Sequence, residues 1–224
     1  MSYNFKLIGY DTDAILFCKQ DGALFSEEEQ NLLIEDLNSL YGEYLNFSND
    51  GYFTKTIMLK AKNYVMVENG KVKTKGSALK SSTKEIALKE FQNDILKAII
   101  DETFNYEEIY TRYVKEALNV TDIKRWCSKK TITKKVLTPE ATTQQKIFDC
   151  IQETDYVEGD KVYTYFSKDG TLQLAENFTG EYDEMVLVKK LHTTAKVFAN
   201  ILPTNELFPN LALKKAAPLL EKYK

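Results

Sequence analysis

The chain of 224 residues is poor in the residue types that build zinc sites, catalytic triads and disulfide frameworks: it has one histidine and three cysteines. With His192 as the only histidine, neither a classical zinc site nor a Ser–His–Asp triad is expected, and His192 is interpreted as a structural residue on a helix. Cys18, Cys127 and Cys150 are scattered without metal-ligand spacing, which predicts free thiols in a reducing compartment. No run of 18 apolar residues and no signal-peptide core is present, so no membrane partner is expected.

Charge is segregated along the chain, although the net charge is only −3. Residues 27–50 hold seven acids and no lysine or arginine, whereas residues 55–90 hold nine lysines against three acids. Residues 124–135 hold six bases and no acid. Two basic blocks in a mildly acidic protein predict a localised polyanion-binding face. For either block alone, a solvated lysine surface is the simpler interpretation.

The sequence pattern predicts a globular α+β chain, because 43% of the residues are hydrophobic and strand-like and helical periods alternate. Strands are expected in a hairpin over 5–18 and at 53–59, 64–67 and 71–74, with a turn at Asn69-Gly70. A helix should begin at the capping box Ser26/Glu29. Further helices are expected from Ser82 or Thr83 to near Glu102, and over 106–118, 141–152 and 182–201. KTITKKV should be strand-like, and GDKVYTYF with TLQLAEN should form a short β excursion.

Two carboxylates, Asp11 and Asp13, stand one residue apart in FKLIGYDTDAILFC, between two apolar β-prone runs. This places hard oxygen ligands at the exposed tip of a buried hairpin, where they would suit Mg²⁺ together with waters and a substrate phosphate. Aspartate is also a common turn residue, so a plain turn is the alternative.

Several motifs occur in an order that resembles the C-terminal part of family B DNA polymerases, most closely the T-even phage branch. The family's palm motif Y-G-D-T-D-S is matched by residues 9–14, GYDTDA, with Tyr and Gly exchanged and Ala in place of Ser. The K-x-Y motif is matched by Lys62-Asn63-Tyr64, and the later hairpin and glycine by Asn69-Gly70 and Lys75-Gly76. KSST at residues 80–83 resembles the phage segment before the final palm helix.

This resemblance implies an antiparallel palm sheet with packed helices over residues 1–104 and a mainly helical, duplex-binding thumb over residues 105–224. Asp11 would be the principal Mg²⁺ ligand of a two-metal site, with Asp13 at the same tip in a less direct role. Lys62 and Tyr64 would contact the minor groove of primer–template DNA and the primer backbone. The phosphates of the product duplex would be contacted by lysines from both parts: Lys71, Lys73, Lys75, Lys80, Lys129, Lys130, Lys134 and Lys135.

The chain lacks the motif A aspartate, the fingers lysine and the exonuclease of that family. We therefore expect no nucleotide addition by the chain alone. The chain is expected to be either a C-terminal fragment of such a polymerase or the small subunit of a split one, in which a partner polymerase chain supplies these parts and the dNTP site. Asn38–Gly42 resembles the fingers motif N-S-x-Y-G, but it lies after the DTD turn and is interpreted as coincidental. Docking on a sliding clamp stays open, since the tail LLEKYK has no clear aromatic motif.

Two other function classes remain beside the polymerase part. One is a non-catalytic nucleic-acid-binding module, and the other is a structural or interaction protein without salt-dependent DNA binding. The resemblance places the chain in the cytoplasm of a phage-infected bacterial cell.

Overall fold

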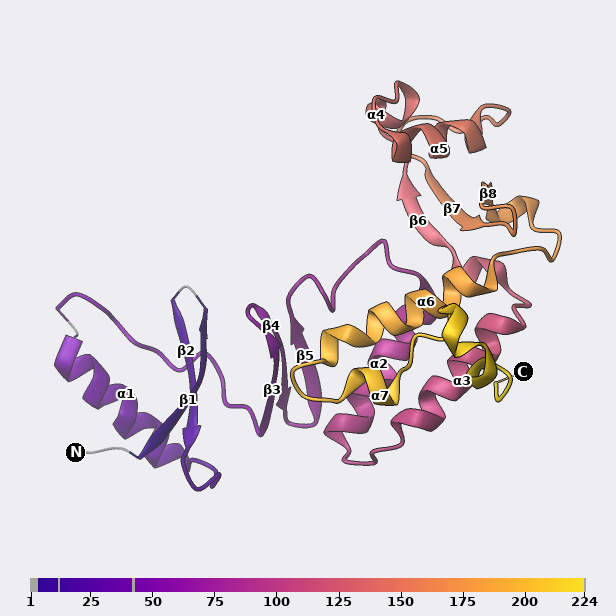
Figure 1. Cartoon of the computed structure of the whole chain (residues 1–224). Helices are drawn as coiled ribbons and strands as arrows, with labels where there is room; N and C mark the ends of the chain where they lie inside the picture. The colour runs from indigo at the N-terminus through magenta and orange to yellow at the C-terminus, as the bar shows by residue number, and fades with distance from the viewer. Residues whose placement is uncertain (1–3, 12, 42, 224) are drawn as a thin grey trace. The chain divides into compact units, whose positions relative to one another are not determined.

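The computed structural model describes residues 4–11, 13–41 and 43–223, with the side chains of Asp11 and Lys215 outside that description. The described chain contains eight α-helices and three antiparallel sheets (Figure 1), so the predicted α+β class is confirmed. It divides into two compact units, Met1–Ser77 and Ala78–Lys224. Among the described helices, none combines the length and apolar character needed to cross a membrane.

The first unit begins with the predicted hairpin. Strands β1 (Phe5–Asp11) and β2 (Ala14–Lys19) pair antiparallel, with an irregularity between Leu7 and Gly9. At the base of the ribbon, the Phe5 and Phe17 rings stack at 5.0 Å between centroids, and Phe25 packs edge-on against both. The expectation of a buried hairpin is wrong, because Leu7, Tyr10 and Ile15 are exposed.

Helix α1 (Glu27–Tyr41) starts with the predicted capping box. The Ser26 N–H donates to Glu29 Oε2 at 2.8 Å, and the Glu29 N–H donates to Ser26 Oγ at 3.2 Å. These bonds satisfy donors at the helix start that have no partner within the helix. Of the α1 residues, only Leu33 is buried, so most of the helix's apolar side chains remain accessible.

A three-stranded sheet completes the first unit. Its strands β3 (Lys55–Lys60), β4 (Asn63–Glu68) and β5 (Lys71–Lys75) pair in the order β3-β4-β5. The central strand β4 carries the buried run Val65–Val67. Asn69 and Gly70 both have positive φ, 50° and 72°, as the hairpin turn predicted from Asn-Gly requires.

The second unit is built on the packed helices α2 (Ile86–Ile100), α3 (Tyr106–Leu118) and α6 (Glu184–Ala195). Phe91 of α2 packs against Tyr110 of α3 and against Phe208, which follows the short helix α7 (Thr204–Leu207). Because α2 packs with α3 and α6, the structural division falls at Ser77/Ala78, whereas the sequence placed a boundary between residues 104 and 105. The assignment of palm and thumb to these regions stays a prediction.

The beginning of α2 is displaced from the predicted Ser82 or Thr83 to Ile86. Residue 85, the N-cap, makes no capping hydrogen bond with its side chain. The Glu85 carboxylate instead accepts hydrogen bonds from Ser128 and Lys190, which are distant in the sequence, so a local capping pattern could not predict them.

The rest of the second unit is a small β-sheet with two short helices (Figure 1). Strands β6 (Ser128–Thr131), β7 (Lys161–Phe166) and β8 (Leu172–Leu174) form a sheet in that order, so the predicted β excursion is confirmed. Helices α4 (Lys134–Leu137) and α5 (Thr142–Ile151) accompany it, and the chain closes with α8 (Ala217–Leu220).

The sequence predicts a short helix mixed with a strand-like KTITKKV in this basic block, whereas in the structure the strand ends at Thr131 and α4 begins at Lys134. Ile132 and Val136 are both buried, in one cluster with Val162 and Leu174. In a strand, Lys134 would share their face, because side chains alternate with period two. The helical turn buries both apolar residues and leaves Lys134 exposed.

Candidate nucleic-acid interface and carboxylate hairpin

The two predicted metal ligands lie at the tip of the β1–β2 ribbon. Asp11 ends β1 with its backbone paired to Ala14, and its side chain lies outside the described part. Asp13 is exposed in the turn. Among the described residues, no group of three His, Cys, Asp or Glu side chains could hold a metal ion. Magnesium binding by Asp11 and Asp13 stays a prediction.

Contact with β3 sets the position of the ribbon. A Cβ built on Gly9 would lie 2.9 Å from Met58 Cε, so the backbone just before Asp11 closely approaches this β3 side chain. Met58 pairs with Tyr64, and Tyr64 pairs with Lys75. Because directly paired residues of antiparallel strands share a face, Met58, Tyr64 and Lys75 lie on the same face of the sheet. The carboxylate ribbon thus lies beside the face that carries β5 lysines.

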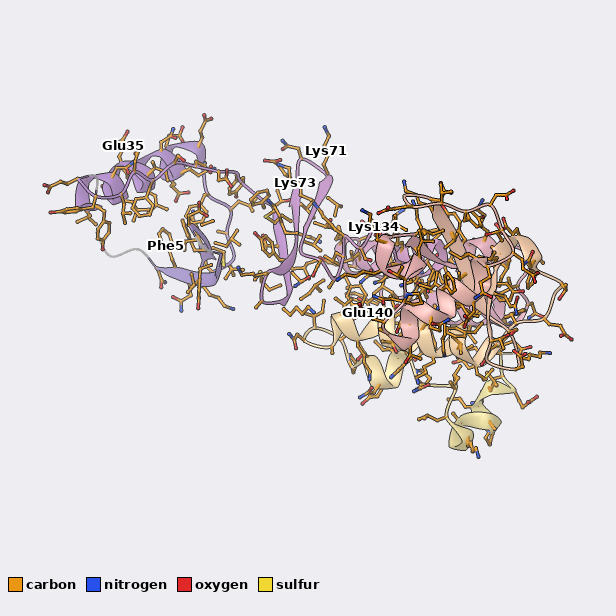
Figure 2. All side chains as sticks on the ribbon, turned by 90° about the horizontal axis from the view of Figure 1, so that it is seen from above. Phe5, Glu35, Lys71, Lys73, Lys134 and Glu140 are labelled. Atoms are coloured by element: carbon orange, nitrogen blue, oxygen red, sulfur yellow. The ribbon has the colours of Figure 1, made fainter. Side chains whose placement is uncertain are left out.

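Lys71, Lys73 and Lys75 are exposed at alternate positions of β5 and share one face, as predicted (Figure 2 labels the first two). Lys73 Nζ lies 2.5 Å from Glu68 Oε2 and 5.7 Å from the centroid of the Phe53 ring. These contacts hold the middle lysine in place, whereas no ion pair is found for Lys71 and Lys75 within the described residues. The β5 part of this face is therefore positively charged and open to solvent, whereas Tyr64 and Met66 on the same face of β4 are buried.

The two matched segments of the K-x-Y region meet in space. Gly76 has φ +101°, and a Cβ there would lie 2.3 Å from the Lys62 carbonyl oxygen and 2.4 Å from Asn63 Oδ1. Lys62 is exposed in a tight turn with φ +59°. Asn63 is buried and donates from Nδ2 to the Ala61 carbonyl at 3.0 Å, a role that the motif alone does not reveal. Glycine at position 76 is required for this close approach.

Tyr64 is 8% exposed in β4, so most of its ring is covered within the described chain. The structure thus puts the Lys62 amine at the surface and most of the Tyr64 side chain below it. Contact between Tyr64 and a DNA groove stays a prediction.

The KSST segment at residues 80–83 lies against strand β6 of the second unit. Lys80 is exposed ahead of α2, and the Thr83 carbonyl accepts the Lys129 N–H at 3.3 Å. Glu85 is 7% exposed and accepts from Ser128 Oγ at 2.6 Å and from Lys190 Nζ at 2.7 Å. Burial opposes ionisation of Glu85, but the Lys190 ammonium and the Ser128 hydroxyl outweigh it and lower the carboxyl pKa.

The remaining predicted lysines lie on one segment of the second unit. Lys129 and Lys130 are half-buried in β6, and Lys134 and Lys135 are exposed at the start of α4 (Figure 2 labels Lys134). None of the four is found in an ion pair with a described carboxylate. They remain available to an external anion.

Sequence reasoning missed two neighbours of this lysine segment. Tyr163 pairs directly with Lys129, and Lys124 Nζ lies 4.9 Å from the centroid of the Tyr163 ring. Lys161 follows on the same face as Tyr163, since the two are two residues apart in β7. The alternating pattern of KVYTYF indicates that Lys161 and Tyr163 share a face. Only the register with β6 shows that the Tyr163 ring lies beside Lys129.

Two residues that the sequence analysis set aside as non-functional make hydrogen bonds within the fold, and Gly42 of the N-S-x-Y-G match lies outside the described residues. The Asn38 side chain closes the loop after α1, with Nδ2 donating to the Phe47 carbonyl at 2.8 Å and Oδ1 accepting the Phe47 N–H at 2.7 Å. His192 is buried with Nδ1 2.7 Å from the Phe208 carbonyl oxygen. Both are structural. The three cysteines form no disulfide, and burial raises the pKa of the Cys127 thiol to about 12.

A solved structure is similar in fold to this chain. It is the family B DNA polymerase from the hyperthermophilic archaeon Pyrobaculum calidifontis, with a TM-score of 0.64 and 15% sequence identity over 88% of this chain. The fold is family B polymerase-like. This chain spans only 27% of the length of that polymerase. No family model and no curated protein matches the sequence.

The polymerase-like fold accounts for the coexistence of the small sheets and the helical unit in one chain. The level of identity establishes the fold and not the activity, and the likeness is to an archaeal enzyme. Function has to be argued from the residues.

Proposed function

We propose that this chain is the palm-tip and thumb part of a family B DNA-directed DNA polymerase, related in its motif order to the T-even phage branch. One observation carries the proposal. In a polymerase-like fold, the Lys62–Tyr64 and Lys75-Gly76 segments meet on a lysine-bearing sheet, and the aspartate ribbon lies beside that sheet.

The carboxylate ribbon would hold Mg²⁺ against the primer 3′ end, with Asp11 as the principal ligand and Asp13 beside it. When bound, magnesium would lower the pKa of the 3′-hydroxyl and neutralise charge on the transferred phosphoryl group. Asp13 is exposed at the tip and accessible to such an ion. Two carboxylates are too few for a two-metal centre, so motif A has to supply the remaining ligand, and this chain alone performs no nucleotide addition.

The lysines would hold primer–template DNA through its phosphates. Exposed lysine amines occur on β5, ahead of α2, in the turn before β4 and at the start of α4. Such amines suit contacts with the phosphate backbone of DNA and do not read its base sequence. Lys62 would reach the minor groove, whose N3 and O2 acceptors are shared by all base pairs.

The rest of the polymerase would come from a segment carrying the exonuclease, the fingers with their dNTP site, and motif A. That segment is either a separate partner chain or another part of one longer polypeptide. A sliding clamp is a further possible partner at the C-terminus, and the cytoplasm of a phage-infected bacterium is the proposed location.

The second candidate is a DNA-binding module derived from a polymerase and lacking catalysis. It needs only the exposed lysines and no metal ligand. The two candidates differ in what the aspartates do, because unmetallated carboxylates beside phosphate only repel it.

The test is Asp11→Ala in the polymerase reassembled with its exonuclease, fingers and motif A. We expect duplex affinity measured without Mg²⁺ to be unchanged or improved, because a carboxylate that repels phosphate is removed, while primer extension with Mg²⁺ is abolished. Normal extension by this variant would refute the catalytic role, and an assembled wild-type complex without extension would favour the binding module.

A further inference from the structure

The carboxylate of Glu85 is buried at the start of α2 but does not cap that helix. Glu85 is 7% exposed, and its side chain makes no capping hydrogen bond. Its Oε1 accepts from Ser128 Oγ at 2.6 Å and from Lys190 Nζ at 2.7 Å. One carboxylate oxygen thus joins α2, β6 and α6, which are distant in the sequence. A local role at the helix terminus does not account for these contacts.

The segment 78–85, which contains KSST, is held at its first end by α2. Gln92 of α2 is 2% exposed and donates from Nε2 to the Ala78 carbonyl at 3.2 Å. Its Oε1 accepts from Lys84 Nζ at 3.0 Å. The exposed Lys80 therefore lies on a segment whose backbone is fixed against the helix.

At its second end, the same segment is joined to β6. The Thr83 carbonyl accepts the Lys129 N–H at 3.3 Å, beside the bond from Ser128 Oγ to Glu85. Figure 1 shows β6 and β7 running from the helices of this unit toward α4 and α5. One backbone bond and one side-chain bond thus set the direction in which the lysine-bearing strand leaves the helices.

These contacts restrict how β6 can move. A buried carboxylate that loses a hydrogen-bond donor is not compensated by water, so arrangements in which β6 turns away from Glu85 are disfavoured. Duplex DNA presents phosphates at a regular spacing. Amines on elements that are already fixed relative to one another lose less freedom when they bind such an array.

We propose that Glu85 is a positioning residue for DNA binding. Its carboxylate holds the start of β6 against the KSST segment and so keeps Lys80 and Lys129 in one arrangement. Glu85 does not touch DNA and acts through Ser128. The inference rests on the proposed function, which makes duplex DNA the ligand of these lysines.

The sharpest variants are at Ser128. Ser128→Ala removes only the bond between Glu85 and β6 and changes no charge, whereas Ser128→Thr keeps the hydroxyl in a residue that suits a strand. In anisotropy with a short duplex, Ser128→Ala should bind about three- to tenfold more weakly than wild type, and Ser128→Thr should bind as wild type does. The salt slope should be equal in all three, because the number of lysines is unchanged. Wild-type affinity in Ser128→Ala would overturn the inference.

A second pair of variants separates position from charge. Glu85→Ala and Asp94→Ala each remove one carboxylate from α2, but Asp94 binds Arg112 and Tyr113 of α3 and not β6. Loss of a negative charge by itself favours binding of a polyanion. Glu85→Ala should nevertheless weaken duplex binding, whereas Asp94→Ala should retain or improve it. If both variants bind DNA equally, charge alone acts and the inference is wrong.

Hydrogen exchange gives a readout without DNA. The Lys129 N–H should exchange several-fold faster in Ser128→Ala than in wild type, while the amides of α3 keep their rates. Faster exchange with unchanged duplex affinity would reduce the Glu85 bond to a structural role and reject this inference alone. A wild type without duplex affinity would reject the proposed function as well.

Discussion

At the scale of single residues, the candidate interface depends on a few positions whose neighbours allow no other side chain. Gly76 is the clearest case, because its backbone lies against the Lys62 carbonyl and the Asn63 side chain. Its φ of +101° is strained for any residue with a Cβ. This one glycine connects the end of β5 with the turn that carries Lys62.

Gly76→Ala is expected to lower the free energy of unfolding by about 1–3 kcal/mol through strain and the clash with the Lys62 carbonyl. Gly22→Ala is the matched control, since Gly22 also has positive φ, +76°, but nothing within 4 Å of an added Cβ. Urea unfolding of both variants measures the difference. An equal loss in the two would show that the close approach to Lys62 does not matter.

Glu85 gives a pH dependence whose sign follows from its lowered pKa. A carboxyl with a lower pKa in the folded state contributes stability above its unfolded pKa, near 4.5, and loses it as pH falls through the folded value. We therefore expect Glu85→Gln to be less stable than wild type at neutral pH, with the gap closing as the pH is lowered below 4.5. Urea unfolding across that pH range measures the gap. A difference that is the same at every pH would contradict the ionised Lys190 contact.

At the scale of elements, the sequence predicted those features that local chemistry determines. The capping box of α1 and the Asn69-Gly70 turn are formed by residues close in the chain, and both are present. The beginning of α2 was misplaced because Glu85 is bound by Lys190, 105 residues away. The α4 turn was missed because the buried cluster around Ile132 and Val136 is assembled from four separate elements.

The sheet face of β5 can be tested with a control built into the same sheet. Lys71→Gln/Lys75→Gln removes two charges from the proposed DNA face, whereas Lys55→Gln/Lys60→Gln removes two from positions that pair with Val67 and Asn63 on the other face. The first pair should weaken duplex binding and reduce the salt slope by about 2. The second should leave the slope unchanged. Equal effects would mean that DNA does not distinguish the two faces.

At the scale of the whole molecule, the motif order in the sequence predicts a polymerase-like chain. The α+β class and the general likeness to family B polymerases hold. The division of the chain could not be read from the pattern, since it depends on which elements pack together. Leu7 and Ile15 have the spacing of core residues, yet nothing described covers them.

The central claim is that the aspartates at the ribbon tip hold magnesium at a DNA end. Its most direct test uses this chain assembled with the polymerase part that carries motif A. The affinity of this complex for a primer–template with a recessed 3′ end is measured by anisotropy at constant ionic strength, with Mg²⁺ or with EDTA. Wild type should bind several-fold more tightly with Mg²⁺, because the metal replaces carboxylate–phosphate repulsion with coordination. Asp11→Asn/Asp13→Asn should bind equally in both buffers, and the exposed control Asp50→Asn should behave as wild type. A wild type indifferent to Mg²⁺, or a double variant that keeps the Mg²⁺ effect, would contradict the account.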